Sequence, residues 1–212
     1  MNDVLARLAA QRILPVIRTD DPLDAVATAH ACAAAGVTVV ELTCTTPDVA
    51  DALDALRDTG LCIGLGTVRS TADVRTAIGG GAAFVVSFTN PPEMIAEAHR
   101  AGLAAIPGAL TPTEVSACAA QGADAVKLFP ARMLAPDHLA DLRAVLPDVR
   151  IMVTGGLRPA DSARWLAAGA VAVGLGSVLG TVATAGAAAV TRRTAAALAA
   201  ATVPDNDREP ST

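Results

Sequence analysis

The chain has 212 residues, of which 52% are hydrophobic and 17% charged, which excludes general disorder and allows one or two folded domains. Aromatic residues make up 2% and the net charge is −5. A nucleic-acid partner is therefore not expected, because such proteins normally carry basic stripes and stacking aromatics.

The N-terminal stretch, MNDVLARLAAQRILPV, interrupts its apolar residues with Asp3, Arg7 and Arg12. A secretory signal needs an unbroken apolar core, so we expect a cytoplasmic protein. The cysteines are widely spaced, without a Cys-x-x-Cys motif or histidine pairs at ligand intervals, and we expect free thiols and no metal site. They are Cys32, Cys44, Cys62 and Cys118.

Short apolar runs rich in β-branched residues recur along the chain and predict eight strands. They span residues 13–17, 37–42, 61–66, 82–87, 103–108, 124–129, 149–156 and 170–177. The intervening stretches carry apolar residues at helical spacing. Those at 21–36 and 46–60 begin near Asp, Thr or Pro and end near Gly, as helices do.

Continuous apolar strands that alternate with helices favour parallel pairing with helices outside. Eight such units predict an α/β fold, a (β/α)8 barrel over residues 1–202, with an open doubly wound sheet as the alternative. The polar segment 203–212 is expected to be a disordered tail. Residues 165–191 carry no charge, but their glycines would break a helix, so no membrane span is expected.

In a parallel barrel, chemistry lies at the carboxyl ends of the strands. Polar or glycine residues occupy this position after six of the predicted strands. They are Arg18, Glu41, Thr67, Lys127, Thr154, Gly155, Gly156, Gly176 and Ser177. The glycines and the serine after the last two strands would expose backbone N–H groups to an anion, which predicts a phosphate site. The alternative is that these glycines only form tight turns.

Lys127 is the only lysine of the chain, within the apolar run DAVKLFPAR. Such a lysine either extends to the rim, where it binds an anion, or serves as a nucleophilic amine. Glu41, in VVEL, is either a surface group or a carboxyl turned into a crowded interior, where it would suit proton transfer. Together, an amine and a carboxyl can form an enamine from a 2-keto acid without a metal.

Six short motifs, in order, resemble the class I 2-keto-3-deoxy-6-phosphogluconate aldolases and the related 6-phosphogalactonate and 4-hydroxy-2-oxoglutarate aldolases. They are PVIR, VVELT, GLGTV, VKLFPA, TGG and GLGS, within residues 10–180. The resemblance implies a barrel enzyme that cleaves a phosphorylated 2-keto sugar acid to pyruvate and glyceraldehyde 3-phosphate. It also implies a homotrimer and no cofactor.

The resemblance assigns roles to individual residues. It implies that Lys127 forms the Schiff base and that Glu41 is the general acid/base, acting through a water molecule. Thr67 would help to hold the keto-acid carboxylate, and Phe129 would wall the imine. Thr154, Gly155, Gly156 and Ser177 would line the substrate and its phosphate end.

The sequence departs from the family pattern in two places. Thr45 stands where phosphogluconate-type members have arginine, whereas Arg18 matches an arginine of the phosphogalactonate type. Phe88 replaces a proline found in some members. The parent sugar acid therefore stays open, as does 4-hydroxy-2-oxoglutarate. A phosphate-binding isomerase or synthase barrel without Schiff-base chemistry, and a noncatalytic phosphosugar-binding barrel, are the other interpretations.

Overall fold

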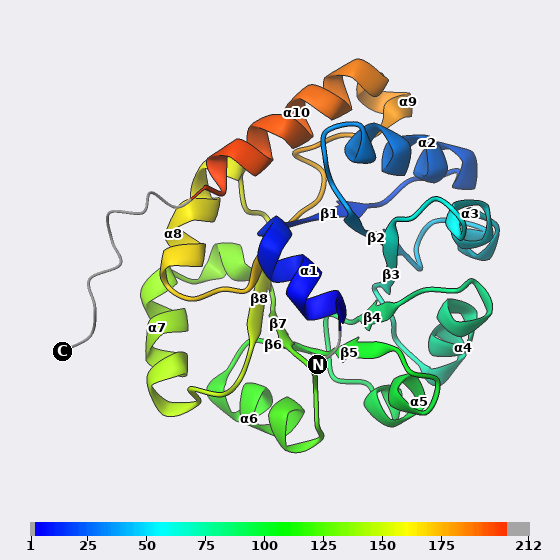
Figure 1. Cartoon of the computed structure of the whole chain (residues 1–212). Coiled ribbons are helices and arrows are strands. Elements are labelled where there is room, and N and C mark those ends of the chain that lie inside the picture. The colour runs from blue at the N-terminus through cyan, green and yellow to red at the C-terminus, as the bar shows by residue number, and fades with distance from the viewer. Residues whose placement is uncertain (1–2, 203–212) are drawn as a thin grey trace.

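The computed structural model describes residues 3–202, in which strands and helices alternate (Figure 1). The strands are β1 (Ile13–Ile17), β2 (Val39–Thr43), β3 (Cys62–Gly66), β4 (Phe84–Val86), β5 (Ala104–Ile106), β6 (Gly108–Ala109), β7 (Val126–Leu128), β8 (Ile151–Thr154) and β9 (Ala172–Leu175). The helices are α1 (Asp3–Gln11), α2 (Pro22–Ala33), α3 (Val49–Leu56), α4 (Thr71–Gly79), α5 (Met94–Arg100), α6 (Pro112–Ala120), α7 (Pro136–Val145), α8 (Ser162–Ala167), α9 (Val182–Ala185) and α10 (Ala187–Ala200), with 3₁₀ turns η1 (Ala131–Met133) and η2 (Pro159–Asp161).

All strand pairs are parallel, in the order β5-β4-β3-β2-β1-β9-β8-β7-β6. The two outermost strands of this order, β5 and β6, are consecutive in the chain and are separated only by Pro107. The Pro107 carbonyl accepts a hydrogen bond from the Lys127 N–H at 2.8 Å, and Gly108 N–H donates to the Thr89 carbonyl at 2.7 Å. This segment therefore closes the barrel, and the predicted (β/α)8 fold is confirmed.

The strand predictions differ from the structure mainly at the ends. The fifth predicted strand, 103–108, is two short strands, because Pro107 has no N–H to donate to a sheet. The seventh, expected over 149–156, ends at Thr154, since Gly155 and Gly156 take positive φ values of 108° and 74°. The expected tail at 203–212 lies outside the described residues, and the domain boundary at residue 202 stays a prediction.

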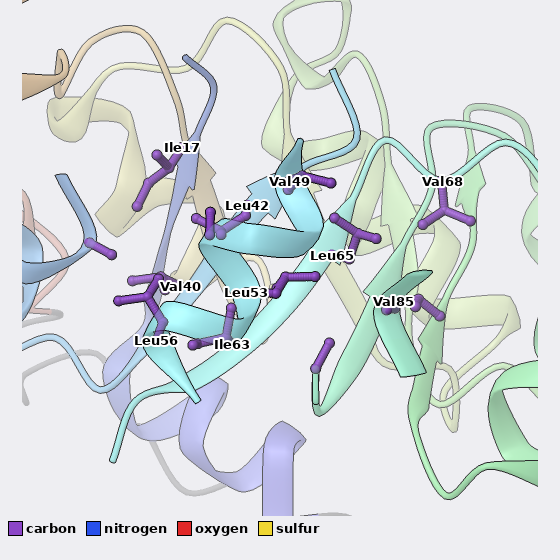
Figure 2. Close-up of a cluster of buried hydrophobic side chains, with 14 of the residues drawn as sticks. Ile17, Val40, Leu42, Val49, Leu53, Leu56, Ile63, Leu65, Val68 and Val85 are labelled. Carbon is purple, nitrogen blue, oxygen red and sulfur yellow. The ribbon is translucent and has the colours of Figure 1, made fainter. Parts of the chain in front are cut away.

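The side chains of each strand alternate between two buried layers. Outward side chains pack against the helices: Figure 2 shows Val40 and Leu42 of β2 facing Leu53 and Leu56 of α3. Inward side chains fill the barrel, where Leu14 belongs to one cluster with Phe84 and Met152. A residue between two outward side chains is thus directed into the barrel.

Helix α1 closes the amino-terminal end of the barrel. It lies across the strands, inside the ring of outer helices (Figure 1), and its Leu8 belongs to the interior cluster. Gln11 fixes this position: its amide nitrogen donates to the carbonyls of Ile13 and Val39, and its amide oxygen accepts from the N–H groups of Thr38 and Val39.

The four cysteines are free thiols, as expected. Burial raises the pKa of each thiol, to about 12 for Cys44 and to about 11 for Cys118. The uncharged segment 165–191 is divided among α8, β9, α9 and part of α10. Within residues 3–202, no helix combines the length and apolar character that a bilayer span requires.

Replacing Gln11 with alanine is expected to lower the free energy of unfolding by about 1–3 kcal/mol, because partly buried backbone groups lose their partners. The measurement is urea unfolding followed by circular dichroism. Gln121→Ala is the matched control, because Gln121 is the exposed residue that caps the carboxyl end of α6. Equal stability of the two variants would contradict the conclusion that the hydrogen bonds of Gln11 hold α1 in place.

Candidate active site

Glu41 and Lys127 meet inside the carboxyl end of the barrel. Glu41 lies between the outward residues Val40 and Leu42 of β2, and Lys127 lies between Val126 and Leu128 of β7. Both side chains are consequently directed inward, with exposed fractions of 0% for Glu41 and 5% for Lys127. The distance from Lys127 Nζ to Glu41 Oε1 is 3.8 Å.

A glycine provides the space for the Glu41 carboxyl group. A β-carbon at Gly66 of β3 would lie 1.8 Å from Glu41 Oε1, so only glycine fits there. Neither oxygen of Glu41 has a hydrogen-bond partner among the described residues. Burial raises the pKa of Glu41, while the positive charges of Lys127 and Arg18 counter part of the rise.

An aromatic wall covers the lysine. The Phe129 ring centroid lies 5.5 Å from Lys127 Nζ, and Phe88 packs against Phe129 edge to face with the centroids 6.4 Å apart. Gly155 allows this approach, because a β-carbon there would lie 2.9 Å from Cδ2 of Phe129. The Phe129 ring therefore forms one side of the pocket around the amine, and Phe88 packs against that ring.

Arg18 and Thr67 lie together at the rim, after β1 and β3. Arg18 Nη2 donates a hydrogen bond to Thr67 Oγ1 at 3.4 Å. Thr67 has a φ of 60°, a left-handed conformation that is strained for a β-branched residue. The next residue, Val68, is buried and donates its N–H to the Val86 carbonyl at 3.1 Å. These contacts hold the strained turn at the cavity.

The turns after β8 and β9 form a further part of the rim, which begins next to Arg18 because β9 pairs with β1. Thr154 is buried, its Oγ1 has no partner in the part of the chain that the structure describes, and Gly174 leaves room for it. Gly155 and Gly156 turn sharply away from β8. Ser177 is exposed beside them at the cavity.

The ten residues singled out in the sequence all line one cavity of about 650 Å³. They are Arg18, Glu41, Thr67, Lys127, Phe129, Thr154, Gly155, Gly156, Gly176 and Ser177. Arg132, Thr181 and Thr184 also line the cavity, although their sequence positions did not predict it. Arg132 stands at the end of the quoted run DAVKLFPAR, while Thr181 and Thr184 carry no sequence signal beyond their position after β9.

A parallel barrel that directs a lysine amine toward a buried carboxyl group, within an accessible cavity, has the form of an enzyme active site for carbonyl chemistry. Comparison with known proteins agrees. The family model described as "KDPG and KHG aldolase" matches residues 4–201. The chain belongs to this family, and it is an aldolase, a carbon–carbon lyase.

Individual relatives cover most of the chain. A probable 2-dehydro-3-deoxy-6-phosphogalactonate aldolase of Rhizobium meliloti is 34% identical over 79% of this chain and 81% of its own length. A solved 4-hydroxy-2-oxoglutarate/2-dehydro-3-deoxyphosphogluconate aldolase is 37% identical, with a TM-score of 0.82 over 93% of this chain and 98% of that one. The KDPG aldolase of Legionella pneumophila, solved with pyruvate captured as a covalent carbinolamine, is 27% identical, with a TM-score of 0.83 over 91% and 97% of the two chains.

Gly66→Ala is expected to lower the free energy of unfolding by about 1–3 kcal/mol, because the added methyl group collides with the Glu41 carboxyl group. The double variant Glu41→Ala/Gly66→Ala should recover most of this loss in a double-mutant cycle measured by urea unfolding. Gly79→Ala is the control, since a β-carbon at Gly79 meets no atom within 4 Å. Additive effects of the two substitutions would show that Gly66 does not make room for Glu41.

The raised pKa of Glu41 predicts a characteristic pH dependence of stability. A folded-state pKa above the unfolded value gives a contribution that is complete below the unfolded pKa, about 4.3 for Glu, and is lost as pH rises through the folded value. The free energy of unfolding of the wild type minus that of Glu41→Gln should therefore fall as pH rises. Urea unfolding at a series of pH values measures this difference.

Glu114 provides a control of opposite sign. Hydrogen bonds from the Leu110 and Thr111 N–H groups lower the pKa of Glu114. The wild-type minus Glu114→Gln difference should be present above the ordinary Glu pKa and should be lost as pH falls through the lowered value. A wild-type minus Glu41→Gln difference that is flat, or rises with pH as for Glu114, would contradict the assignment.

Proposed function

We propose that the protein is a class I aldolase that reversibly cleaves a 2-keto-3-deoxy-6-phospho sugar acid to pyruvate and glyceraldehyde 3-phosphate. The observation that carries this proposal is the 3.8 Å separation of the Lys127 amine from the buried Glu41 carboxyl group inside an accessible cavity. An amine nucleophile and a proton carrier are the two groups that Schiff-base cleavage requires.

Lys127 forms the covalent intermediate. Its unprotonated amine attacks the C2 carbonyl carbon, and the carbonyl oxygen takes up protons and leaves as water, which gives a protonated imine. This imine accepts electrons, so the carbon–carbon bond can break without a metal. Phe129, with its ring centroid 5.5 Å from Nζ, shields the imine from solvent on one side.

Glu41 transfers the protons. As the base, through a water molecule, it takes the proton of the C4 hydroxyl group; C4 becomes a carbonyl, and the C3–C4 electron pair moves to the imine to give an enamine and the free aldehyde. The enamine then takes a proton at C3, and water hydrolyses the imine to release pyruvate and the amine. Burial raises the pKa of Glu41, so the carboxyl can hold the proton between these steps.

Two groups of residues around the cavity would suit the two anionic ends of such a substrate. Arg18 and Thr67, joined by a 3.4 Å hydrogen bond, would hold the carboxylate beside the keto group. Thr154, Gly155, Gly156, Gly176 and Ser177 form the second group, where backbone N–H groups and a hydroxyl favour a phosphate.

The relatives support two kinds of aldehyde product. Their names include 6-phosphogalactonate and phosphogluconate aldolases, which fits a phosphorylated sugar acid. The second candidate is 4-hydroxy-2-oxoglutarate, cleaved to pyruvate and glyoxylate, because the solved relative at 37% identity bears that name also. Both substrates share the Schiff-base steps. We further propose that the protein acts in the cytoplasm and that it is a homotrimer, the latter as the family resemblance implies; analytical ultracentrifugation tests the assembly.

Reduction with borohydride in the presence of pyruvate tests the covalent step. Because Lys127 is the only lysine, an intact-mass shift that maps to the peptide carrying Lys127 identifies the Schiff base unambiguously. We expect no adduct with Lys127→Ala or Lys127→Arg, each with unchanged circular dichroism. Glu41→Gln should retain the adduct but slow aldol cleavage by about 10²–10⁴-fold.

A folded wild-type protein that gives no adduct would refute the class I mechanism. The phosphate-binding isomerase or synthase barrel would then be the better interpretation, with Lys127 as an anion ligand. Release of pyruvate from phosphorylated sugar acids and from 4-hydroxy-2-oxoglutarate, compared by kcat/KM, decides between the two substrate candidates.

A further inference from the structure

Arg132 lies between the active-site cavity and a second cavity beside it. It belongs to the turn η1, which follows β7 and therefore comes shortly after Lys127 in the chain. Its side chain lines the main cavity together with Gly155 and Gly156. It also lines a neighbouring cavity of about 390 Å³, beside Arg158 and Arg164.

Packing fixes Arg132 against the proposed phosphate end of the site. Its N–H donates a hydrogen bond to the Gly155 carbonyl at 3.0 Å, which ties the turn after β7 to the turn after β8. Its aliphatic stem lies on Gly156: a β-carbon there would lie 2.5 Å from Arg132 Cδ and 3.1 Å from its Cβ. The backbone has φ = 74° at Gly156, a conformation that glycine adopts without strain.

The guanidinium of Arg132 is available for a ligand. It is exposed, and within residues 3–202 no carboxylate lies within ion-pair distance of it. The adjacent Arg158 differs, because it is paired with Asp161, with Nε 3.4 Å from Oδ2. Arg132 is thus a charged group beside the active site without a protein counter-ion in the described chain.

The charge balance of the cavity also indicates an anion at this point. The charged residues that line it, among those described, are Arg18, Lys127, Arg132 and the single carboxylate Glu41. Glu41 and Lys127 face each other at 3.8 Å, so each already has its partner within the protein. Two guanidinium charges remain. Arg18 lies with Thr67, and Arg132 lies with Gly155 and Gly156, so the two guanidinium groups stand on different turns of the rim.

We propose that Arg132 is a specificity-determining residue that binds the terminal phosphate of the substrate. This inference rests on the proposed function and deepens it, because it makes the enzyme selective for phosphorylated over unphosphorylated aldehydes. Backbone N–H groups and the Ser177 hydroxyl donate neutral hydrogen bonds, whereas a guanidinium adds a charge and a two-pronged donor that matches phosphate oxygens.

The kinetic consequence is specific. Arg132 binds an atom group remote from the reacting carbons, in the ground state and the transition state alike, so its loss should raise KM and leave kcat nearly unchanged. For Arg132→Ala, we expect the KM for glyceraldehyde 3-phosphate, in condensation with pyruvate, to rise by about tenfold or more. The kcat/KM for unphosphorylated glyceraldehyde should stay within about twofold of wild type, because that aldehyde offers no phosphate.

Two further variants sharpen the test. Arg132→Lys keeps the positive charge but loses the planar arrangement of N–H donors. We expect a KM for glyceraldehyde 3-phosphate between those of the wild type and Arg132→Ala. Arg158→Ala is the matched control: it removes a neighbouring guanidinium that is paired with Asp161 and lines only the second cavity, and it should leave both aldehydes unaffected.

Trapping of pyruvate by borohydride separates the possible failures. Pyruvate carries no phosphate, so every Arg132 variant should form the Lys127 adduct normally. If the wild type forms no adduct, both the proposed function and this inference are refuted. If the adduct forms but Arg132→Ala keeps the wild-type preference for the phosphorylated aldehyde, the inference alone is refuted. An equal loss of kcat/KM for both aldehydes would also refute it, since Arg132 would then act on cavity shape.

Discussion

The buried pair of titratable groups, the Glu41 carboxyl and the Lys127 amine, is the constraint on which the rest of the structure depends. Taking a carboxylate and an ammonium out of water costs several kcal/mol for each ion, unless their attraction and other contacts offset it. The barrel brings the two within 3.8 Å, and Gly66 leaves the space that the carboxyl occupies. No described group donates a hydrogen bond to Glu41. The effect of burial therefore outweighs the attraction of the positive charges nearby, and the pKa of Glu41 is raised.

The alternation of strand side chains serves stability and chemistry at once. On β2, Val40 and Leu42 pack outward against helices, and Glu41 between them is directed inward. On β7, Val126 and Leu128 pack outward in the same way, and Lys127 between them is directed inward. The outward packing fixes the strand register, and the register fixes where the inward groups lie. The separation of amine and carboxyl group is therefore a property of the whole barrel.

The charges of the cavity contrast with those of the chain. The protein carries a net charge of −5, yet guanidinium groups of Arg18 and Arg132 face the mouth of the barrel, beyond the Lys127–Glu41 pair. A concave site with low-dielectric walls concentrates the field of such charges and attracts anions. The cavity thus offers a positive site to a substrate with two negative ends, although the molecule as a whole is acidic.

The sequence by itself determined the alternation of strands and helices, and nine of the ten predicted cavity residues, because apolar runs, glycine stops and polar strand ends are local features. Phe129 was predicted only through the family resemblance. Only the tertiary structure decided the closure through Pro107, the space at Gly66 and the contact of Arg132 with Gly156. Each of these joins segments that are distant in the chain, and no local propensity encodes which strands become neighbours. The family resemblance supplied roles for Lys127 and Glu41, but their distance and burial arise from packing.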